Sequence, residues 1–468
     1  MKISLIIISG ILVISLAVLI LFFNEVELSL AIMIGIVAGI ITTTLIILNP
    51  FMGLLLIVIV NQFSSLFSSQ FNASLGRMIG VIVAIGWFLK YFSMKRTVFF
   101  DLISFNKIAV LFIISMLVST LLSSYPVQSI QQFFKITLLV LMVFFMQDFI
   151  DKKNKLNVFI ITFALSIGIG SLFGIFQYKS LIAGTLNVGE QNIGTMIYQG
   201  ADKTARVAGL RNNANDYGLM LLSGIPLLLF LSLNASNFFL KTFSAIFFVT
   251  SVVSLGLSSS RISIFGFLIY ISLYVVLSLL YGKVEKKQWT LLLIIITIIV
   301  LMSSLFLYDI VTERDYSFED DSSIVRSSLF LKAVDLFSEN PLFGIGFGNI
   351  ELLGRPLDKY YNVYNHPGHD LVSGTFVCIG LIGSALLIWI CVRTVKYSLI
   401  ALKQCRKLHD KYLLNLNITL IAAFIAFIST GFGNDVIFQR IFWIYIALAV
   451  IMHKWTSSRL ISISSSSR

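Results

Sequence analysis

The sequence predicts an all-α polytopic membrane protein with about 14 transmembrane helices, or 12 to 14 if adjacent spans are divided differently. Of its 468 residues, 57% are hydrophobic and only 12% are charged, and the mean hydropathy is +0.95. Soluble globular domains carry about 25% charged residues. Apolar runs of roughly 20 residues, long enough to cross the hydrocarbon core of a bilayer, recur along the whole chain.

The apolar segments are assigned as spans in chain order. Asn24-Glu25 follows the first segment where a small-residue cleavage site would be expected, so we interpret that segment as an uncleaved span. We predict one integral membrane domain over residues 1–468, without a separate soluble domain. The predicted spans are 3–23, 28–48, 51–67, 76–93, 107–123, 131–149, 156–176, 214–233, 238–257, 262–281, 290–308, 371–394, 414–432 and 436–453.

The distribution of basic residues predicts the orientation of these spans. An even number of spans puts both termini on the same side, and cytoplasmic loops are enriched in lysine and arginine. Most of the 34 lysines and arginines fall in the segments between spans that are then cytoplasmic. The short outer turns hold none, namely 24–27, 68–75, 124–130 and 431–435. The net charge of +12 is therefore interpreted as a topology signal in the cytoplasmic membrane, and not as a nucleic-acid-binding surface.

Two predicted outer loops are much longer than the other turns, at 178–213 and 309–369. Loops of this length in a compact fold are usually functional. In the second loop, apolar residues recur at helical spacing from Val325 to Leu336, and Asn340-Pro341 is a stop signal. This pattern predicts an amphipathic helix on the outer membrane face.

A glycine-rich stretch, "NPLFGIGFGN", follows this predicted helix. Its spaced glycines resemble a nucleotide-binding loop, but no strand precedes them and the segment is predicted to face outward. We therefore expect Gly344, Gly346 and Gly348 to allow close backbone packing at a turn.

Several arginines lie at predicted outer ends of spans, where the topology rule disfavours cations. Arg261 stands between two tightly joined spans, and Arg206 and Arg211 precede the span at 214–233, which Asn215 and Asp216 could cap. A cation in such a position snorkels to the interface, or it has a partner or a function. The planar guanidinium group suits phosphate, because it donates bidentate hydrogen bonds.

Two of the four histidines lie close together in "YNVYNHPGHDLVSG", as His366 and His369. Pro367-Gly368 places a turn between them, which disfavours a helical metal pair, and no metal-ligand spacing appears elsewhere. The sequence therefore predicts no metal and no cofactor. By itself, His369 fits either a polar residue at a helix start or a general base of ordinary pKa.

Four segments together resemble the O-antigen ligase/polymerase superfamily of membrane glycosyltransferases, within residues 200–385. "RVAGLRNNANDYG" is similar to an Arg-x-x-Gly stretch followed by Pro-Asn, although Ala214 replaces the usual proline. "SSSRISIFG" resembles the Ser-Arg motif. "VRSSLFLKAVDLFSENPLFGIGFGN" is similar to the long-loop helix and its glycine-rich end. "HDLVSGTFVCIGLIG" resembles the His-Asn segment, with Asp370 where asparagine is usual.

The resemblance implies that glycan is transferred from a polyprenyl diphosphate carrier to an acceptor hydroxyl outside the cytoplasmic membrane, without a metal. It implies that His369 is catalytic and that Arg206, Arg261 and Arg326 bind the diphosphate. On the residues alone, Arg326 could equally be a solvated side chain of the amphipathic helix. Secondary candidates for the site are Arg211, His366, Asp370 and Arg440.

The predicted function is polymerisation of a cell-surface polysaccharide of the O-antigen, capsule, exopolysaccharide or teichuronic acid type. One alternative is an O-antigen-type ligase with a different acceptor, because both activities share these motifs. An alternative of another class is a flippase for lipid-linked oligosaccharides, which would show repeats and charges at mid-membrane. Expected partners are the polyprenyl diphosphate-linked oligosaccharide, the lipid bilayer, and flippase and chain-length regulator proteins, with no nucleic acid.

Overall fold

The computed structural model describes residues 39–62, 75–93, 104–182, 198–199, 205–211, 213–282, 321–347, 349 and 371–466. Within these residues, eight helices are long and apolar enough to cross a membrane, and four apolar helices are shorter. The structure is helical, as the sequence predicts, apart from two strands of two residues each. The predicted spans 3–23 and 290–308 lie outside the described residues, so the count of 14 stays a prediction.

The helices follow the predicted spans closely. The amino-terminal half contains α3 (Pro50–Gln62), α5 (Leu75–Ser93), α6 (Ser104–Leu121), α7 (Pro126–Phe149) and α8 (Lys153–Ile182). After the strands β1 (Tyr198–Gln199) and β2 (Ala205–Arg206) come α9 (Ala214–Asn234), α10 (Phe238–Leu257) and α11 (Arg261–Tyr281). The remainder contains α13 (Asp321–Glu339), η2 (Leu371–Phe376), α14 (Val377–Lys407), α15 (Lys411–Ser429), η3 (Thr430–Phe432), η4 (Val436–Phe438) and α16 (Arg440–Ser466).

Several helices extend beyond their predicted bounds, and α7, α14 and α16 are examples. The predicted spans end at 394 and 453, whereas α14 and α16 continue to Lys407 and Ser466. Hydropathy marks where the apolar stretch ends, but backbone hydrogen bonding continues through the more polar turns beyond it. In addition, α7 begins at Pro126 and not at residue 131, because proline is favoured in the first turn of a helix.

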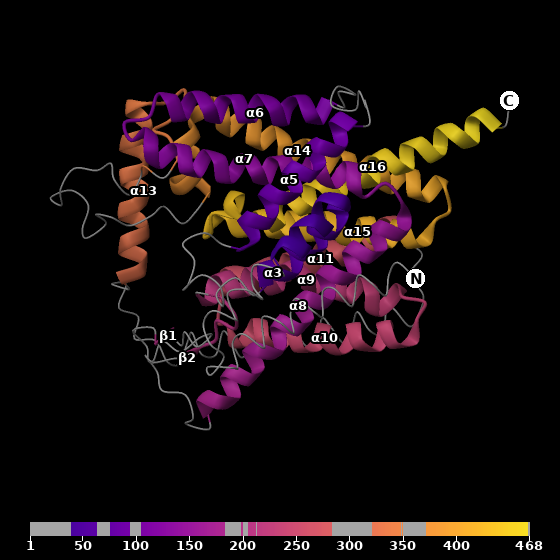
Figure 1. Cartoon of the computed structure of the whole chain (residues 1–468). Helices are drawn as coiled ribbons and strands as arrows, with labels where there is room; N and C mark the ends of the chain where they lie inside the picture. Colours follow the sequence, from indigo (N-terminus) through magenta and orange to yellow (C-terminus); the bar gives the residue numbers. More distant parts are fainter. Residues whose placement is uncertain are drawn as a thin grey trace.

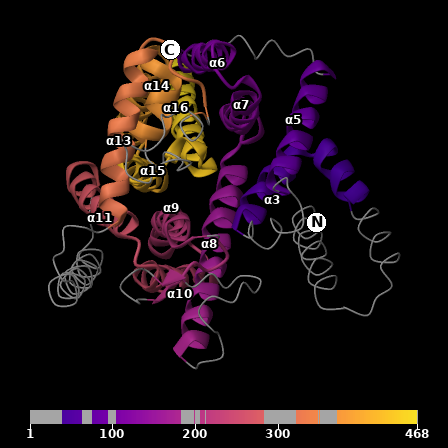
Figure 2. The same ribbon diagram turned by 90° about the vertical axis from the view of Figure 1, so that its left-hand side faces the viewer.

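The centre of the bundle is formed by α9 and α15, which pack against each other and against α11. Figure 2, which looks along the bundle, shows α9 and α15 among the other helices, with α10 below α9 and the end of α8 extending further down. In the most apolar stretch of α9, 83% of residues are buried, compared with 22% in α10. Because both helices are similarly apolar, this difference means that α10 lies at the outside of the bundle with its apolar side chains exposed.

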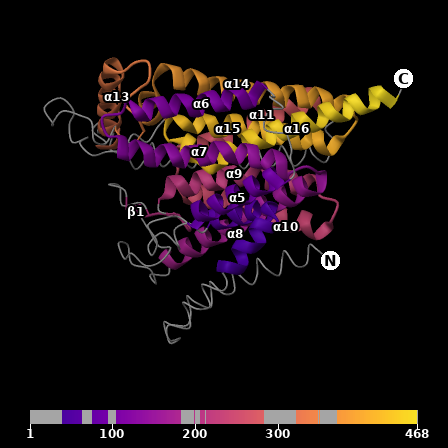
Figure 3. The same ribbon diagram turned by 45° about the horizontal axis from the view of Figure 1, so that its top comes forward.

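The long helices run roughly side by side, so the bundle has two ends (Figure 1). One end carries β2, the turn at 258–260 and the turn at 433–435, and we call it the arginine end. The opposite end carries the turn at 408–410 and the start of α8, and we call it the Asp410 end. Figures 1 and 3 both show α13 lying across the helix ends on the same side as β1.

α13 covers the predicted amphipathic helix and ends before Asn340-Pro341, as expected. Its residues Ala333 and Leu336 are buried, while Phe330 and Val334 are exposed. The helix contacts η2 and the start of α14. It therefore fastens the segment before the glycine-rich turn against the first turns of α14.

The glycine-rich turn is inserted into a break in α14. Gly380 has φ 65° and ψ −171°, and Gly344 has φ 72°, conformations that favour glycine. The backbone of the turn bonds to the broken helix, since Ile345 N donates to Val377 O and Leu381 N donates to Pro341 O. A Cβ atom at Gly344 would lie 2.5 Å from the carbonyl oxygens of Val377 and Cys378. The predicted role of Gly344 in close packing is thus confirmed.

Candidate functional site

The side chain of Arg206 joins two parts of the arginine end. Its Nε donates to Ser258 O at 3.2 Å, and its Nη2 donates to Ser259 O at 3.2 Å and to Asn215 Oδ1 at 2.9 Å. Val207 N donates to Leu257 O beside these contacts. Burial lowers the pKa of Arg206 from its ordinary value, but the group remains charged at neutral pH.

Arg206 therefore fixes the turn that precedes Arg261. Ser259 in this turn has φ 49°, a conformation that costs free energy in a residue with a Cβ. The carbonyl oxygens of Ser258 and Ser259, on either side of the Ser259 Cα, both accept from Arg206, which compensates for that cost. Arg261 is the first residue of α11 and is exposed. The guanidinium group of Arg261 is thus presented next to the positive end of the α11 dipole.

The start of α9 differs in detail from the prediction. The N-cap residue is Asn213, whose Oδ1 accepts from Asp216 N at 2.7 Å. Asn215 lies in the first turn, and its side chain accepts from Arg206. Sequence spacing alone does not separate these roles, because Asn213, Asn215 and Asp216 all have side chains that can cap a helix.

Four cations from separate elements come together elsewhere at the arginine end, and we call them the basic cluster. They are Arg77 of α5, Lys135 of α7, Arg211 of the loop before α9, and Arg440 at the start of α16. Lys135 interacts electrostatically with Arg77 and Arg440, and Arg440 interacts with Arg77 and Arg211. Two of the secondary candidates, Arg211 and Arg440, are therefore brought together.

Neighbouring side chains hold the basic cluster in place. Arg440 Nη1 donates to Asn61 Oδ1 at 3.0 Å, and Lys135 Nζ lies 4.7 Å from the centre of the Phe438 ring. The guanidinium group of Arg440 also packs against Gly76, where a Cβ atom would collide with it. A glycine at residue 76 thus leaves room for the Arg440 guanidinium beside Arg77.

The cluster is connected to the segment that carries the predicted catalytic histidine. Asp435, which interacts with Lys135, accepts a hydrogen bond from Thr375 Oγ1 at 2.7 Å. Thr375 is fully buried in η2, six residues after His369 in the chain. A carboxylate thereby links the cations to the start of the η2–α14 element.

Several predicted site residues lie outside what the structure describes. His366, His369 and Asp370 are among these residues, and for Arg326 only the backbone in α13 is described. Of the three predicted diphosphate ligands, Arg206 and Arg261 are placed on either side of one turn. The convergence of Arg326 with them stays a prediction. Within the described residues, no group of three or more histidine, cysteine, aspartate or glutamate side chains could hold a metal ion.

The sequence interpretation did not single out Lys135 or Thr375. Lys135 is the tenth residue of α7, where the apolar stretch of the helix begins, and an ionisable residue in a predicted span is a reason to expect a functional site. The predicted start at residue 131 placed this lysine nearer the helix end and hid that signal. No sequence signal distinguishes Thr375, because its role depends on Asp435, 60 residues away in the chain.

Together, these features define a polytopic helical membrane protein with a cationic site at one end of its bundle. Residues 246–388 match the family model described as O-antigen ligase, which confirms the resemblance to the O-antigen ligase/polymerase superfamily. The match includes Arg261, Arg326 and His369, and hence three of the four similar segments. It excludes Arg206 and the whole basic cluster. A search of curated proteins found no match.

Proposed function

We propose that the protein is a glycosyltransferase that polymerises a cell-surface polysaccharide. The donor is a glycan linked to a polyprenyl diphosphate, and the acceptor is a hydroxyl group on a second glycan. Transfer takes place at the arginine end, on the outer face of the cytoplasmic membrane. The observation that carries this proposal is that Arg206 bonds to the turn that precedes Arg261, a residue of the segment that matches the O-antigen ligase model.

The chemistry follows from the charges involved. The acceptor oxygen attacks the anomeric carbon, the bond from this carbon to the diphosphate oxygen breaks, and the electron pair leaves with the diphosphate. The proton of the acceptor hydroxyl passes to neutral His369, acting as general base. Arg261 and Arg326 stabilise the charge that grows on the leaving diphosphate, and Arg206 contributes its charge while fixing the turn before Arg261.

A defined assay tests this proposal. Purified protein in lipid nanodiscs is given a polyprenyl diphosphate-linked repeat unit, and the products are separated by chain length. We expect longer lipid-linked glycans together with released polyprenyl diphosphate, at the same rate with and without EDTA, because guanidinium groups supply the positive charge. Loss of activity on chelation would contradict the metal-independent mechanism.

The same preparation distinguishes the alternatives. A ligase would leave the chain length unchanged and transfer the glycan only when a different acceptor is added. A flippase would form no new glycosidic bond, but would move the intact donor across the membrane of a liposome. The flippase and chain-length regulator proteins that we expect as partners are left out of this assay, so any lengthening is due to this chain.

A further inference from the structure

The backbone that follows β2 is bonded to two helices. Val207 N donates at 3.2 Å to the carbonyl oxygen of Leu257, the last residue of α10. Ala208 N and Gly209 N both donate to Gln177 Oε1 of α8, at 3.1 and 2.8 Å. Three successive N–H groups are therefore held by α8 and α10.

The side chain of Gln177 supplies the acceptor for two of these groups. Gln177 is 5% exposed, and Ala208 and Gly209 are buried as well. Buried backbone N–H groups are nearly always hydrogen bonded, and leaving one without an acceptor is costly. A side chain without a carbonyl oxygen at residue 177 would therefore remove both of these contacts between α8 and the backbone after β2.

Tyr217 of α9 packs against the same backbone. Gly209 has φ 55°, and a Cβ atom there would collide with the Tyr217 ring. Tyr217 is fully buried, and its Oη donates to Gly170 O of α8 at 3.2 Å. The ring that supports Gly209 is thus itself bonded to α8, the helix that carries Gln177.

These contacts lie within three residues of Arg206. Its guanidinium group donates at 3.2 Å to both Ser258 O and Ser259 O, in the turn before Arg261. A shift of about 1 Å in the backbone of Arg206 would strain or break these hydrogen bonds. Misplacement of that size can lower the rate of an enzyme about 10²-fold, even when its cause is far from the chemistry.

We infer that Gln177 is a positioning residue for glycan transfer. By holding the backbone after β2, it keeps Arg206 on the turn that presents Arg261 to the diphosphate. This inference rests on the proposed function for the identity of the reaction. Gln177 follows the predicted span 156–176 and lies outside the segment that matches O-antigen ligase, so neither hydropathy nor the family match points to it.

Two substitutions of Gln177 that differ in the acceptor test this role in the nanodisc transfer assay. Gln177→Met keeps a long side chain but lacks a carbonyl oxygen, whereas Gln177→Glu retains oxygens that can accept from both N–H groups. We expect Gln177→Met to lower kcat per folded protein at least about tenfold, because the arginines act on charge that develops in the transition state. The KM for the donor should stay within about twofold of wild type. Gln177→Glu should retain most of the activity.

Gln147→Met is the matched control. Gln147 is also a buried glutamine, and its Nε2 donates to Val143 O at 3.2 Å within α7, near the Asp410 end. The substitution is the same, but the site is remote from the arginine end, so kcat should stay within about twofold of wild type.

A double-mutant cycle separates positioning from a general disturbance of the protein. If Gln177 acts through Arg206, Gln177→Met should cost less than about twofold in kcat when added to Arg206→Lys, which already loses contacts to the turn. Losses that multiply would show that the two residues act independently, and would overturn the inference. Full activity of folded Gln177→Met would overturn it as well.

Hydrogen exchange measures the contact itself, without a substrate. A peptide covering residues 205–211 should exchange faster in Gln177→Met than in wild type or Gln177→Glu, while peptides of α9 stay protected. Equal exchange in all three proteins would refute the inference, and transfer by wild type would still support the proposed function. Faster exchange without any transfer by wild type would instead refute the proposed function, although Gln177 does hold this backbone.

Discussion

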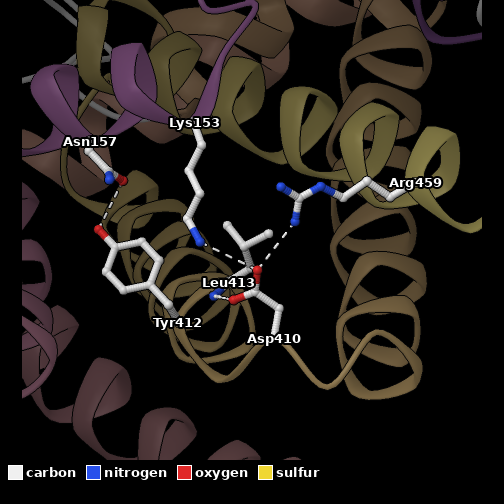
Figure 4. Close-up of polar contacts among 6 residues, drawn as sticks. All are labelled: Lys153, Asn157, Asp410, Tyr412, Leu413 and Arg459. Atoms are coloured by element: carbon white, nitrogen blue, oxygen red, sulfur yellow. Dashed lines mark hydrogen bonds and ion pairs between the residues drawn. The ribbon is translucent and has the colours of Figure 1, made fainter.

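The two ends of the bundle are both rich in basic residues but use them differently. At the Asp410 end, Asp410 Oδ2 lies 3.4 Å from Lys153 Nζ and 3.3 Å from Arg459 Nη1 (Figure 4). The other carboxylate oxygen accepts from Leu413 N at 3.1 Å and caps α15. Nearby, Tyr412 Oη donates to Asn157 Oδ1 at 3.0 Å. Apart from the cap of α15, these contacts join helices that are distant in sequence.

At the arginine end, cations are gathered next to one another. Arg77, Lys135 and Arg440 interact mutually, and Arg211 adds a further charge to Arg440. The two ends thus differ in arrangement: at the Asp410 end a carboxylate lies between two basic side chains, whereas at the arginine end basic side chains from several elements lie near one another.

The largest expected effect is on thiol labelling in intact cells, which reports which end of the bundle faces outward. In a background lacking the natural cysteines, Gly200→Cys and Ile350→Cys should react with an impermeant thiol reagent in intact cells, and Glu285→Cys should not. The reason is the excess of lysine and arginine in the predicted cytoplasmic segments. Labelling of residue 285 alone would reverse the orientation and place the arginine end in the cytoplasm.

The next largest effect is expected at His369. His369→Ala should reduce polymer formation by about 10²- to 10⁴-fold, the usual cost of losing a general base, while the protein stays in the membrane at normal levels. Polymer formation is measured on gels that separate polymers by length, and the level of the protein is measured by immunoblots of membranes. His366→Ala is the control and should be milder. The opposite ranking would make His366 the catalytic candidate.

Lysine substitutions separate positioning from diphosphate binding at the arginine end. Arg206→Lys keeps the charge, but lysine cannot donate to Ser258, Ser259 and Asn215 at once. We expect it to lower polymer formation nearly as much as Arg206→Ala. We also expect the free energy of unfolding to fall by about 1 kcal/mol or more, which is measured as a lower Tm of the purified protein.

Arg261→Lys is the matched comparison, because Arg261 is exposed at the start of α11. It should impair transfer while leaving the Tm unchanged. Normal transfer by Arg261→Lys would show that this residue supplies only a positive field and does not bind the diphosphate bidentately.

The smallest effect is expected at the Asp410 end. Asp410→Asn removes the ion pairs with Lys153 and Arg459 but retains a side chain that caps α15 well. Both cations are at least 36% exposed, so the loss should be under about 1 kcal/mol in total and polymer formation should not change. Asp410→Ala also loses the cap and should lower the Tm further. A large loss of activity in Asp410→Asn would contradict the contrast between the two ends.

Local features of the chain were sufficient to predict most of the helices that the structure describes. The apolar runs give α10 with its predicted bounds of 238 and 257, and Asn340-Pro341 marks the end of α13. The roles of Gly344 and Gly346 as close-packing residues also follow from local pattern, and both have positive φ values. These predictions succeed because hydrophobic length, helix stop signals and glycine conformation act over a few neighbouring residues.

The arrangement of the site required the tertiary structure. The sequence made Arg211 and Arg440 secondary candidates and placed Lys135 only among the outward cations, with nothing to show that they meet. It also could not assign Arg206 to the carbonyl oxygens of Ser258 and Ser259, some 50 residues further along the chain. Such pairings depend on which helices pack together, and a bundle of uniformly apolar helices carries little of that information in its composition.

By itself, the sequence determined that this chain is a membrane bundle, where most of its helices run, and which family its central segment resembles. Those properties come from transfer of apolar segments into lipid and from local motifs. Only the tertiary structure decided which cations share one place and which carboxylates lie beside them. The physical reason is that electrostatic interactions depend on distance and burial, and both are set by packing between helices that are far apart in the chain.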